Sequence, residues 1–238
     1  EIKEDGSPVT LADLNSHQII LEKLSGLNPL FPVLSEEDEV KELIDTSIFW
    51  LVDPLDGTKE FINKNGEFTV NIALIENGFP ILGVVSAPAI HESFYGIPGY
   101  GSFKVKHGKE VRITTSLQDK NSCRITLSKS HQSHLDEDFI REIKNYFNEV
   151  EIVSAGSSLK LCRVADGSAD IYCRMGPTFQ WDISAGQAVA EGSGACVKNL
   201  SGERLGYEFN PEIRNPYFYC AGDPNYDWQK IIKTLDLD

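Results

Sequence analysis

One segment of the chain decides its fold: Phe49-Trp50-Leu51-Val52-Asp53-Pro54-Leu55-Asp56-Gly57-Thr58. Its first four residues are large and apolar, which predicts a buried strand that ends at Asp53. Pro54 keeps the preceding residue extended, so the strand direction continues to the Asp53 carboxylate. A turn after Pro54 is expected to bring Asp56 back beside Asp53, and Gly57 allows a positive φ there. The segment therefore predicts two carboxylates held together at the end of a buried strand.

Two neighbouring carboxylates indicate a cation site. At a separation of about 4 Å they repel each other by roughly 4 kcal/mol at an effective dielectric of 20. A bound cation removes this repulsion. The available ligands are all oxygens, from the carboxylates and the Leu55 carbonyl, and this set favours Mg²⁺ or Mn²⁺ over zinc. The alternative interpretation is an Asp-Pro, Asp-Gly turn that only caps a helix.

Three other acidic positions are candidates for the same site. Glu36 and Glu37 follow a short apolar strand, Asp182 opens a helix of small residues, and Asp13 follows Thr10 at the start of the first helix. Each has an ordinary explanation when taken alone. Glu36 and Glu37 could lie in an exposed loop, Asp182 could be an N-cap, and Asp13 could compensate the helix dipole. Only their combination points to a metal site.

The order of the expected elements predicts two stacked layers of mixed α and β structure. The first half reads as a helix from residue 10 to 24, followed by strands at 31–34, 48–52, 68–75, 81–86, 92–95, 101–105 and 111–114. The second half alternates strands at 124–127, 151–153, 169–173, 195–197 and 217–221 with helices at 136–147, 157–165, 182–191 and 225–235. The pattern predicts an antiparallel sheet with helices on one side, then a mixed sheet.

A change of composition at residues 116–122 predicts a boundary between two halves. Residues 1–116 form the α+β half that carries most of the expected metal ligands. Residues 117–238 form the α/β half that carries Asp182 and the substrate contacts. The active site is expected between the two layers.

Composition excludes several classes of protein. The chain has 238 residues and a net charge of −14, which disfavours binding to nucleic acids because their backbones are also negative. Five cysteines without a C-x-x-C pair argue against a disulfide framework and a zinc site. We expect Cys162, Cys173 and Cys220 to be small core residues. No signal peptide or membrane-spanning segment is recognisable, so a cytoplasmic location is expected, with peripheral membrane association left open.

In this order, the acidic segments resemble the lithium-sensitive, metal-dependent phosphatase superfamily. That group includes inositol monophosphatases, fructose-1,6-bisphosphatases and 3'(2'),5'-bisphosphate nucleotidases. Flanking segments resemble the bacterial bisphosphate nucleotidase branch: Ser7-Pro8-Val9-Thr10, Val33-Leu34-Ser35-Glu36-Glu37, Lys59-Glu60-Phe61-Ile62, residues 66–74 and Gly156-Ser157-Ser158-Leu159-Lys160. The resemblance covers nearly the whole chain and implies the layered α-β-α-β-α sandwich of the sugar phosphatases. Superfamily members usually carry a further helix ahead of the first matched segment, and this leaves the dimer contacts open.

The resemblance also implies a role for individual residues. Glu36, Asp53 and the Leu55 carbonyl are expected to hold one metal ion, and Asp53, Asp56 and Asp182 a second. Because Mg²⁺ polarises water less than zinc does, we further expect a catalytic pair in which Asp13 accepts a hydrogen bond from Thr58 and so activates the attacking water. The expected substrate contacts are Asp56, Gly57, Thr58, Ser157, Lys160 and His131. His131 belongs to a polar cluster, Ser128-Lys129-Ser130-His131. The alternative interpretation of His131, Lys160 and Arg174 is that they are ordinary surface residues.

The expected function is Mg²⁺-dependent hydrolysis of adenosine 3',5'-bisphosphate to AMP and phosphate. Two or three Mg²⁺ ions per site are expected, with Mn²⁺ as a substitute and with Li⁺ and Ca²⁺ as inhibitors. The partner is a small phosphorylated nucleotide, and the sequence leaves open whether the protein is a monomer or a homodimer. Alternatives are an inositol monophosphatase or another sugar-phosphate phosphatase of the superfamily, a non-catalytic metal-binding regulator, and a calcium module, which the lack of an alternating Asp/Asn loop disfavours.

Overall fold

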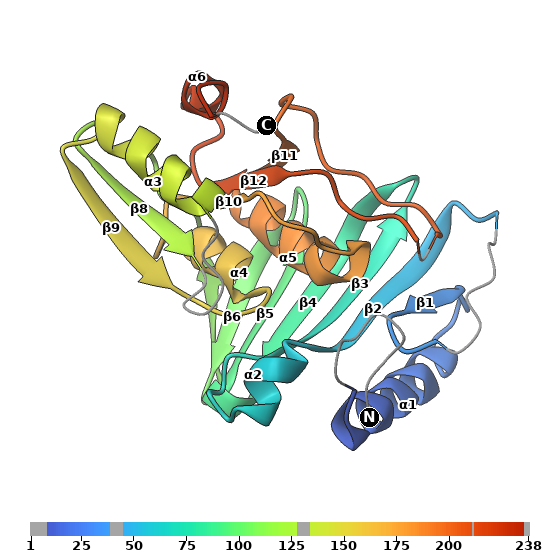
Figure 1. Cartoon of the computed structure of the whole chain (residues 1–238). Helices are drawn as coiled ribbons and strands as arrows, with labels where there is room; N and C mark the ends of the chain where they lie inside the picture. The colour runs from blue at the N-terminus through green and yellow to red at the C-terminus, as the bar shows by residue number, and fades with distance from the viewer. Residues whose placement is uncertain (1–8, 39–44, 128–133, 211, 236–238) are drawn as a thin grey trace.

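The computed structural model describes residues 9–38, 45–127, 134–210 and 212–235. The expected contact residue His131 and the Ser7-Pro8 segment lie outside these ranges. The described chain forms five layers, helix–sheet–helix–sheet–helix, which confirms the predicted sandwich (Figure 1). None of the described helices has the length and apolar character needed to cross a membrane.

The first sheet contains seven strands in sequence order. They are β1 (Val33–Ser35), β2 (Ile48–Asp56), β3 (Thr69–Glu76), β4 (Phe79–Ala87), β5 (Glu92–Ile97), β6 (Gly101–Lys106) and β7 (Lys109–Ile113). The sheet is antiparallel as predicted except at its edge, where β1 runs parallel to β2. The connection between these two strands has about a dozen residues, which is long enough for a parallel crossover.

The first sheet has helices on both faces, whereas the sequence predicted them on one. Helix α1 (Leu11–Ser25) packs Ile20 and Leu24 against Trp50 and Val52 of β2. The opposite face is covered by α5 (Gln180–Ser193), which comes from the second half of the chain. Two short helices follow strands of this sheet, α2 (Thr58–Ile62) after β2 and the 3₁₀ turn η1 (Pro88–Ile90) after β4.

The second sheet is mixed, as predicted. Its strand order is β11 (Cys196–Asn199), β12 (Phe218–Ala221), β10 (Ile171–Arg174), β8 (Ser122–Leu127) and β9 (Glu149–Ser154). The pairs of β8 with β9 and β10 are parallel, and those of β12 with β10 and β11 are antiparallel. Helices α3 (His134–Tyr146) and α6 (Trp228–Ile232) cover its outer face, and α4 (Leu159–Ala165) lies between the sheets.

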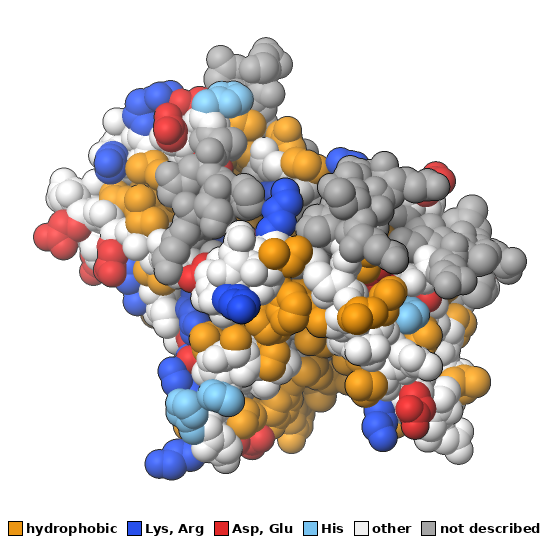
Figure 2. All heavy atoms as spheres, turned by 60° about the horizontal axis from the view of Figure 1, so that its bottom comes forward, with side chains coloured by type: hydrophobic (Ala, Val, Ile, Leu, Met, Phe, Trp, Pro, Cys, Tyr) orange, Lys and Arg blue, Asp and Glu red, His pale blue; other side chains and the backbone are white. Residues whose placement is uncertain are grey.

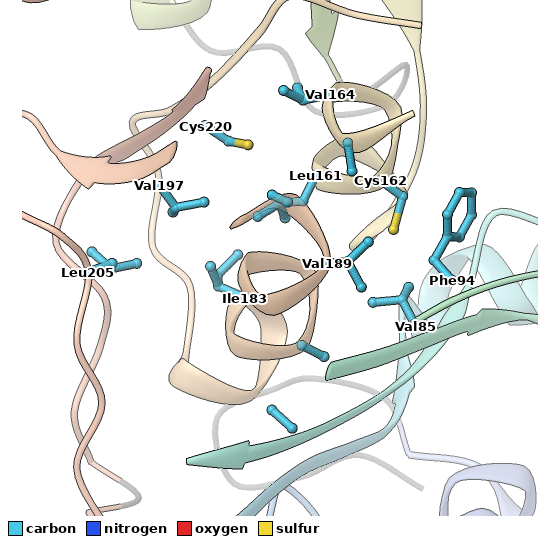
Figure 3. Packing of buried hydrophobic residues seen from close by; sticks show 14 of the residues in the cluster. Val85, Phe94, Leu161, Cys162, Val164, Ile183, Val189, Val197, Leu205 and Cys220 are labelled. Carbon is cyan, nitrogen blue, oxygen red and sulfur yellow. The ribbon is translucent and has the colours of Figure 1, made fainter. Parts of the chain in front are cut away.

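Helices α4 and α5 form the central layer and join both sheets into one core. In this layer Leu161 and Cys162 of α4 face Val189 of α5, with Phe94 of the first sheet beside them (Figure 3). A Cβ atom added at Gly83 would lie 2.3 Å from the backbone oxygen of Ala185, so α5 rests directly on the first sheet. This close contact fixes the distance between α5 and β4 at the second turn of the helix. The predicted core cysteines Cys162, Cys173 and Cys220 are all buried.

Candidate metal and phosphate site

A β-bulge in β2 brings the two carboxylates of the central segment together. Asp53 is paired with Asn71 and Asp56 with Thr69, so β2 has one more residue than β3 between these pairs. Residues three apart on a regular strand point to opposite faces. The extra residue returns Asp56 to the face that carries Asp53. The sequence predicted a turn for this purpose, but β2 instead continues as far as Asp56.

Asp56 is held in place by the second half of the chain. Its Oδ2 atom accepts hydrogen bonds from the backbone nitrogen of Ser158 at 2.9 Å and from its hydroxyl at 3.2 Å. Thr69 and Asn71 of β3 donate to the same oxygen at 3.3 and 3.5 Å. Burial raises the pKa of Asp56, while Lys160 and these donors oppose the shift. Asp56 therefore has a fixed orientation at the junction of the two halves.

Asp53 is a buried acid, Asp182 is a partly exposed one, and both lie close to other carboxyl groups. Burial raises the pKa of Asp53 well above its usual value, and the charges of Glu36, Asp56 and Asp182 raise it further. The Glu36 carboxyl also hydrogen-bonds the Asp53 carboxyl. Burial and then Asp56 raise the pKa of Asp182, although the backbone nitrogen of Phe179 donates to it at 2.8 Å. The surroundings of Asp53 and Asp182 thus favour the uncharged form of both carboxyl groups.

This donor set fits a hard divalent cation. All the groups are oxygens, and a cation is the simplest way to keep several buried carboxylates charged. In the described part of the chain no three His, Cys, Asp or Glu side chains form a ready-made metal cage. Mg²⁺ is a hard cation that binds carboxylate oxygens and keeps several of its waters.

A hydroxyl–carboxylate pair lies beside these acids. Thr58 begins α2, and its Oγ1 donates to Asp13 Oδ1 at 3.0 Å and lies 3.4 Å from the Leu55 carbonyl oxygen. Asp13 is fully buried, and its other oxygen accepts from the backbone and hydroxyl of Thr10 at 2.9 and 2.6 Å. The predicted hydrogen bond between Asp13 and Thr58 is therefore present.

A pocket of about 170 Å³ opens next to Asp56 and Asp182. It is smaller than the sites that enclose whole ligands, so it takes only part of a substrate. The backbone at Gly57 has φ +90°, and a Cβ atom there would lie 2.5 Å from the Ser157 hydroxyl. Only glycine allows this approach. The lining residues are Asp56, Gly57, Glu60, Ser157, Lys160, Tyr172, Arg174, Pro177, Thr178, Asp182 and Ile183.

The far side of the pocket is cationic. Lys160 is buried, donates to the Ser157 carbonyl at 2.8 Å and lies 5.5 Å from the centre of the Tyr172 ring. Burial lowers the pKa of Lys160 to about 8, and Asp56 opposes this shift. Arg174 lines the same pocket, and its Nε atom is buried without a hydrogen-bond partner among the described residues. This unused donor indicates an anion site.

The structure brings together nearly all the residues singled out in the sequence. Sequence reasoning did not identify Tyr172, because it looks like any other apolar strand residue, or Glu60, which lies in a short helix behind Gly57. Neither position carries a local signal, since Tyr172 lies in the second sheet and Glu60 in α2, and only the tertiary fold places them in one pocket.

Comparison with known proteins agrees with this geometry. The family model described as the inositol monophosphatase family matches residues 1–232. The chain belongs to the inositol monophosphatase family. Within this family, it is 46% identical over 220 residues to the 3'(2'),5'-bisphosphate nucleotidase CysQ of Salmonella typhimurium, a match that covers 91% of this chain and 86% of that protein.

Solved structures of the inositol monophosphatase family share the fold. CysQ from Bacteroides thetaiotaomicron is 36% identical, with a TM-score of 0.82 over 92% of this chain and 86% of that one. An IMPase/NADP phosphatase complexed with Mg²⁺ and phosphate is 20% identical, with a TM-score of 0.76 over 100% of this chain and 86% of that one. This second likeness shows the common fold alone.

Proposed function

We propose that the chain is a Mg²⁺-dependent phosphatase that converts adenosine 3',5'-bisphosphate to AMP and phosphate. The observation that carries the proposal is the juxtaposition of a buried acidic site with a cationic pocket. A substrate with two phosphates matches this pair, since one phosphate can lie at the acids with Mg²⁺ and the other at Lys160 and Arg174. The Salmonella relative is named a 3'(2'),5'-bisphosphate nucleotidase, which supports the same substrate class.

The acids are proposed to hold the metal in two groups. Glu36, Asp53 and the Leu55 carbonyl form one, and Asp53, Asp56 and Asp182 form the other. When bound, Mg²⁺ would neutralise negative charge on the phosphoryl oxygens and lower the pKa of water. Two or three ions per site, replacement by Mn²⁺ and inhibition by Li⁺ or Ca²⁺ belong to this proposal.

The chain's own contribution to proton movement lies at Thr58. Because its hydroxyl proton points to Asp13 Oδ1, the lone pairs of Thr58 Oγ1 can accept a hydrogen bond from the attacking water. As the proton of the water moves to Thr58 Oγ1, the hydroxyl proton of Thr58 moves to Asp13 Oδ1, which ends protonated. Gly57 contacts the reacting phosphate in this proposal. Ser157 and Lys160, together with Arg174, contact the second phosphate or the ribose. His131 stays a proposed contact.

The charges on the surface around the site affect which molecules can approach it. On the face that carries α1 and α2, Lys and Arg side chains stand among the acidic ones, so the net charge of −14 does not give this face a uniformly negative field (Figure 2). A small anionic nucleotide can therefore approach it. We include a cytoplasmic location and a monomer or homodimer in the proposal.

The proposal is tested by phosphate release from adenosine 3',5'-bisphosphate, inositol 1-phosphate and fructose 1,6-bisphosphate, each with Mg²⁺ and with EDTA. We expect Mg²⁺-dependent release, with the highest kcat/KM for the nucleotide. A preference for either sugar phosphate would reject the substrate and keep the metal chemistry. Release of no phosphate from any of them would reject the proposed activity.

Replacing Lys160 with Met is expected to raise KM for adenosine 3',5'-bisphosphate about 10- to 100-fold, since a hydrogen bond to a charged group contributes about 1.5–3 kcal/mol. Hydrolysis of 3'-AMP, which lacks the second phosphate, should change little. In the wild type, KM for the bisphosphate should rise as the pH increases through about 8, because Lys160 then loses its charge. Lys144→Met, at an exposed position on α3, is the control. Equal effects on both substrates would contradict this role.

A further inference from the structure

Helix α1 has an inner face that is apolar at one end and polar at the other. Ile20 and Leu24, in its second half, pack on the first sheet. Asp13 and Ser16, in its first half, point to the segment that carries the acids, and the Ser16 hydroxyl donates to the Pro54 carbonyl at 2.8 Å. Residues three and four apart share a helix face. The helix thus contacts the metal-site segments directly through its polar end.

His17 lies on this polar face, one turn after Asp13, and reaches a different segment. Its Nδ1 atom is hydrogen-bonded to the Ser35 hydroxyl at 2.9 Å, and its Nε2 atom is 3.9 Å from Asp38 Oδ1. Asp38 in turn accepts from the backbone nitrogen of Ser35 at 2.7 Å. Ser35 is fully buried. These three residues form a closed set of contacts at the end of β1.

Glu36 is the residue next to this set of contacts in the chain. It directly follows Ser35, its backbone nitrogen donates to the Val52 carbonyl at 3.1 Å, and its carboxyl reaches Asp53. Strand β1 has three residues and lies at the sheet edge, with β2 as its neighbour. An edge strand has a neighbouring strand on one side only, so the position of Glu36 also depends on the side-chain contacts made around Ser35. Asp38 holds the Ser35 backbone, and His17 holds the Ser35 hydroxyl.

We propose that His17 is a positioning residue that sets the distance between Glu36 and Asp53 for metal binding. The inference rests on the proposed function only in that Glu36 and Asp53 are taken as metal ligands. Partners that orient metal ligands typically change metal affinity 10- to 100-fold when they are removed. His17 touches neither substrate nor the reacting atoms, so its loss should act on metal affinity and leave the proton transfer at Thr58 intact.

The test measures Mn²⁺ binding by electron paramagnetic resonance in the absence of substrate. His17→Ala should weaken Mn²⁺ binding about 10-fold or more. Activity should return at high Mg²⁺ with a kcat close to that of the wild type. His17→Asn places an amide near the position of Nδ1 and should restore most of the affinity. Gln18→Ala, at the exposed neighbouring position, should leave Mn²⁺ binding unchanged.

A double-mutant cycle separates positioning from a general loss of structure. If His17 acts through Glu36, then His17→Ala added to Glu36→Gln should cause little further loss of Mn²⁺ affinity. Additive losses, or wild-type affinity in His17→Ala, would overturn the proposal. Because binding is measured without substrate, these outcomes do not depend on the nucleotide assignment, which the hydrolysis panel tests separately. Thermal unfolding in EDTA checks that His17→Asn is folded if His17→Ala is not.

Discussion

Replacing Asp53 with Asn is expected to abolish turnover and, at the same time, to stabilise the protein in the absence of metal. Asp53 belongs to both proposed metal groups, so its loss should lower kcat/KM by about 10³-fold or more, which corresponds to about 4 kcal/mol of transition-state stabilisation. Without metal, the same carboxyl group is buried among other acids, and its charged form is disfavoured. Asparagine keeps the oxygen that accepts from the Leu55 nitrogen at 3.0 Å and removes the charge.

The expected stability gain is about 0.5–2 kcal/mol, the usual range for relieving a strained functional site. Its pH dependence has a defined sign. A raised folded-state pKa means that the folded protein binds a proton more tightly than the unfolded chain does. The wild type in EDTA should therefore become more stable as the pH falls through the raised pKa of Asp53, and Asp53→Asn should reduce this trend.

Urea unfolding between pH 5 and 8, with EDTA and with Mg²⁺, measures both effects. This range lies above that in which Glu92 titrates, whose pKa is lowered to about 2 by Lys106 and Arg163 in spite of its burial. Glu76→Gln, at the exposed end of β3, is the control and should change neither stability nor activity. Preserved Mg²⁺-dependent turnover in Asp53→Asn, or a clear loss of its metal-free stability, would contradict the proposed site.

Replacing Asp13 with Asn is expected to lower kcat about 10²- to 10⁴-fold, the usual contribution of general acid–base catalysis. The amide can still contact the Thr58 hydroxyl, but it no longer attracts its proton as a carboxylate does. Mn²⁺ affinity should change little, because Asp13 contacts Thr58 and Thr10 and belongs to neither proposed metal group. Steady-state kinetics at saturating Mg²⁺, together with direct Mn²⁺ binding, separates the two effects.

Thr10 provides a matched control, because it contacts the same Asp13 carboxylate as Thr58 does. Asp13 and Thr10 form the capping box of α1, so Asp13→Asn also weakens the helix start. Thr10→Ala removes the capping partner and leaves the bond from Thr58 to Asp13. It should cost about 1 kcal/mol of stability and retain most of the activity. If Thr10→Ala loses as much kcat as Asp13→Asn, the role of Asp13 is structural.

Asp53 and Asp56 could be singled out from the sequence because they lie in one continuous segment. Their role as metal ligands stays a prediction. Strand β2 carries Asp53 and Asp56, and an apolar run that ends in Asp-Pro is visible without any partner strand. The bulge that turns Asp56 inward was not predictable, since it exists only in the pairing with Thr69 and Asn71. Local patterns cannot show which strand will be the neighbour.

Other differences between the predicted and the observed fold also arise from contacts between segments that are distant in the chain. The parallel pairing of β1 depends on the connection between β1 and β2, and the covering of the first sheet by α5 depends on docking of the second half. Small residues such as Gly83 allow this docking, but a glycine in a strand gives no indication of which helix approaches it. Tyr172 beside Lys160 likewise results from contacts between segments that are distant in the chain.

The hydrogen bonds from Ser158 to Asp56 join residues that are 102 positions apart. Contacts of such sequence separation close late, because the entropy of a long loop must be lost before they form. During synthesis, Asp53 and Asp56 leave the ribosome well before the residue that orients Asp56 has been made. The observed orientation of Asp56 thus forms only after Ser158 has been made.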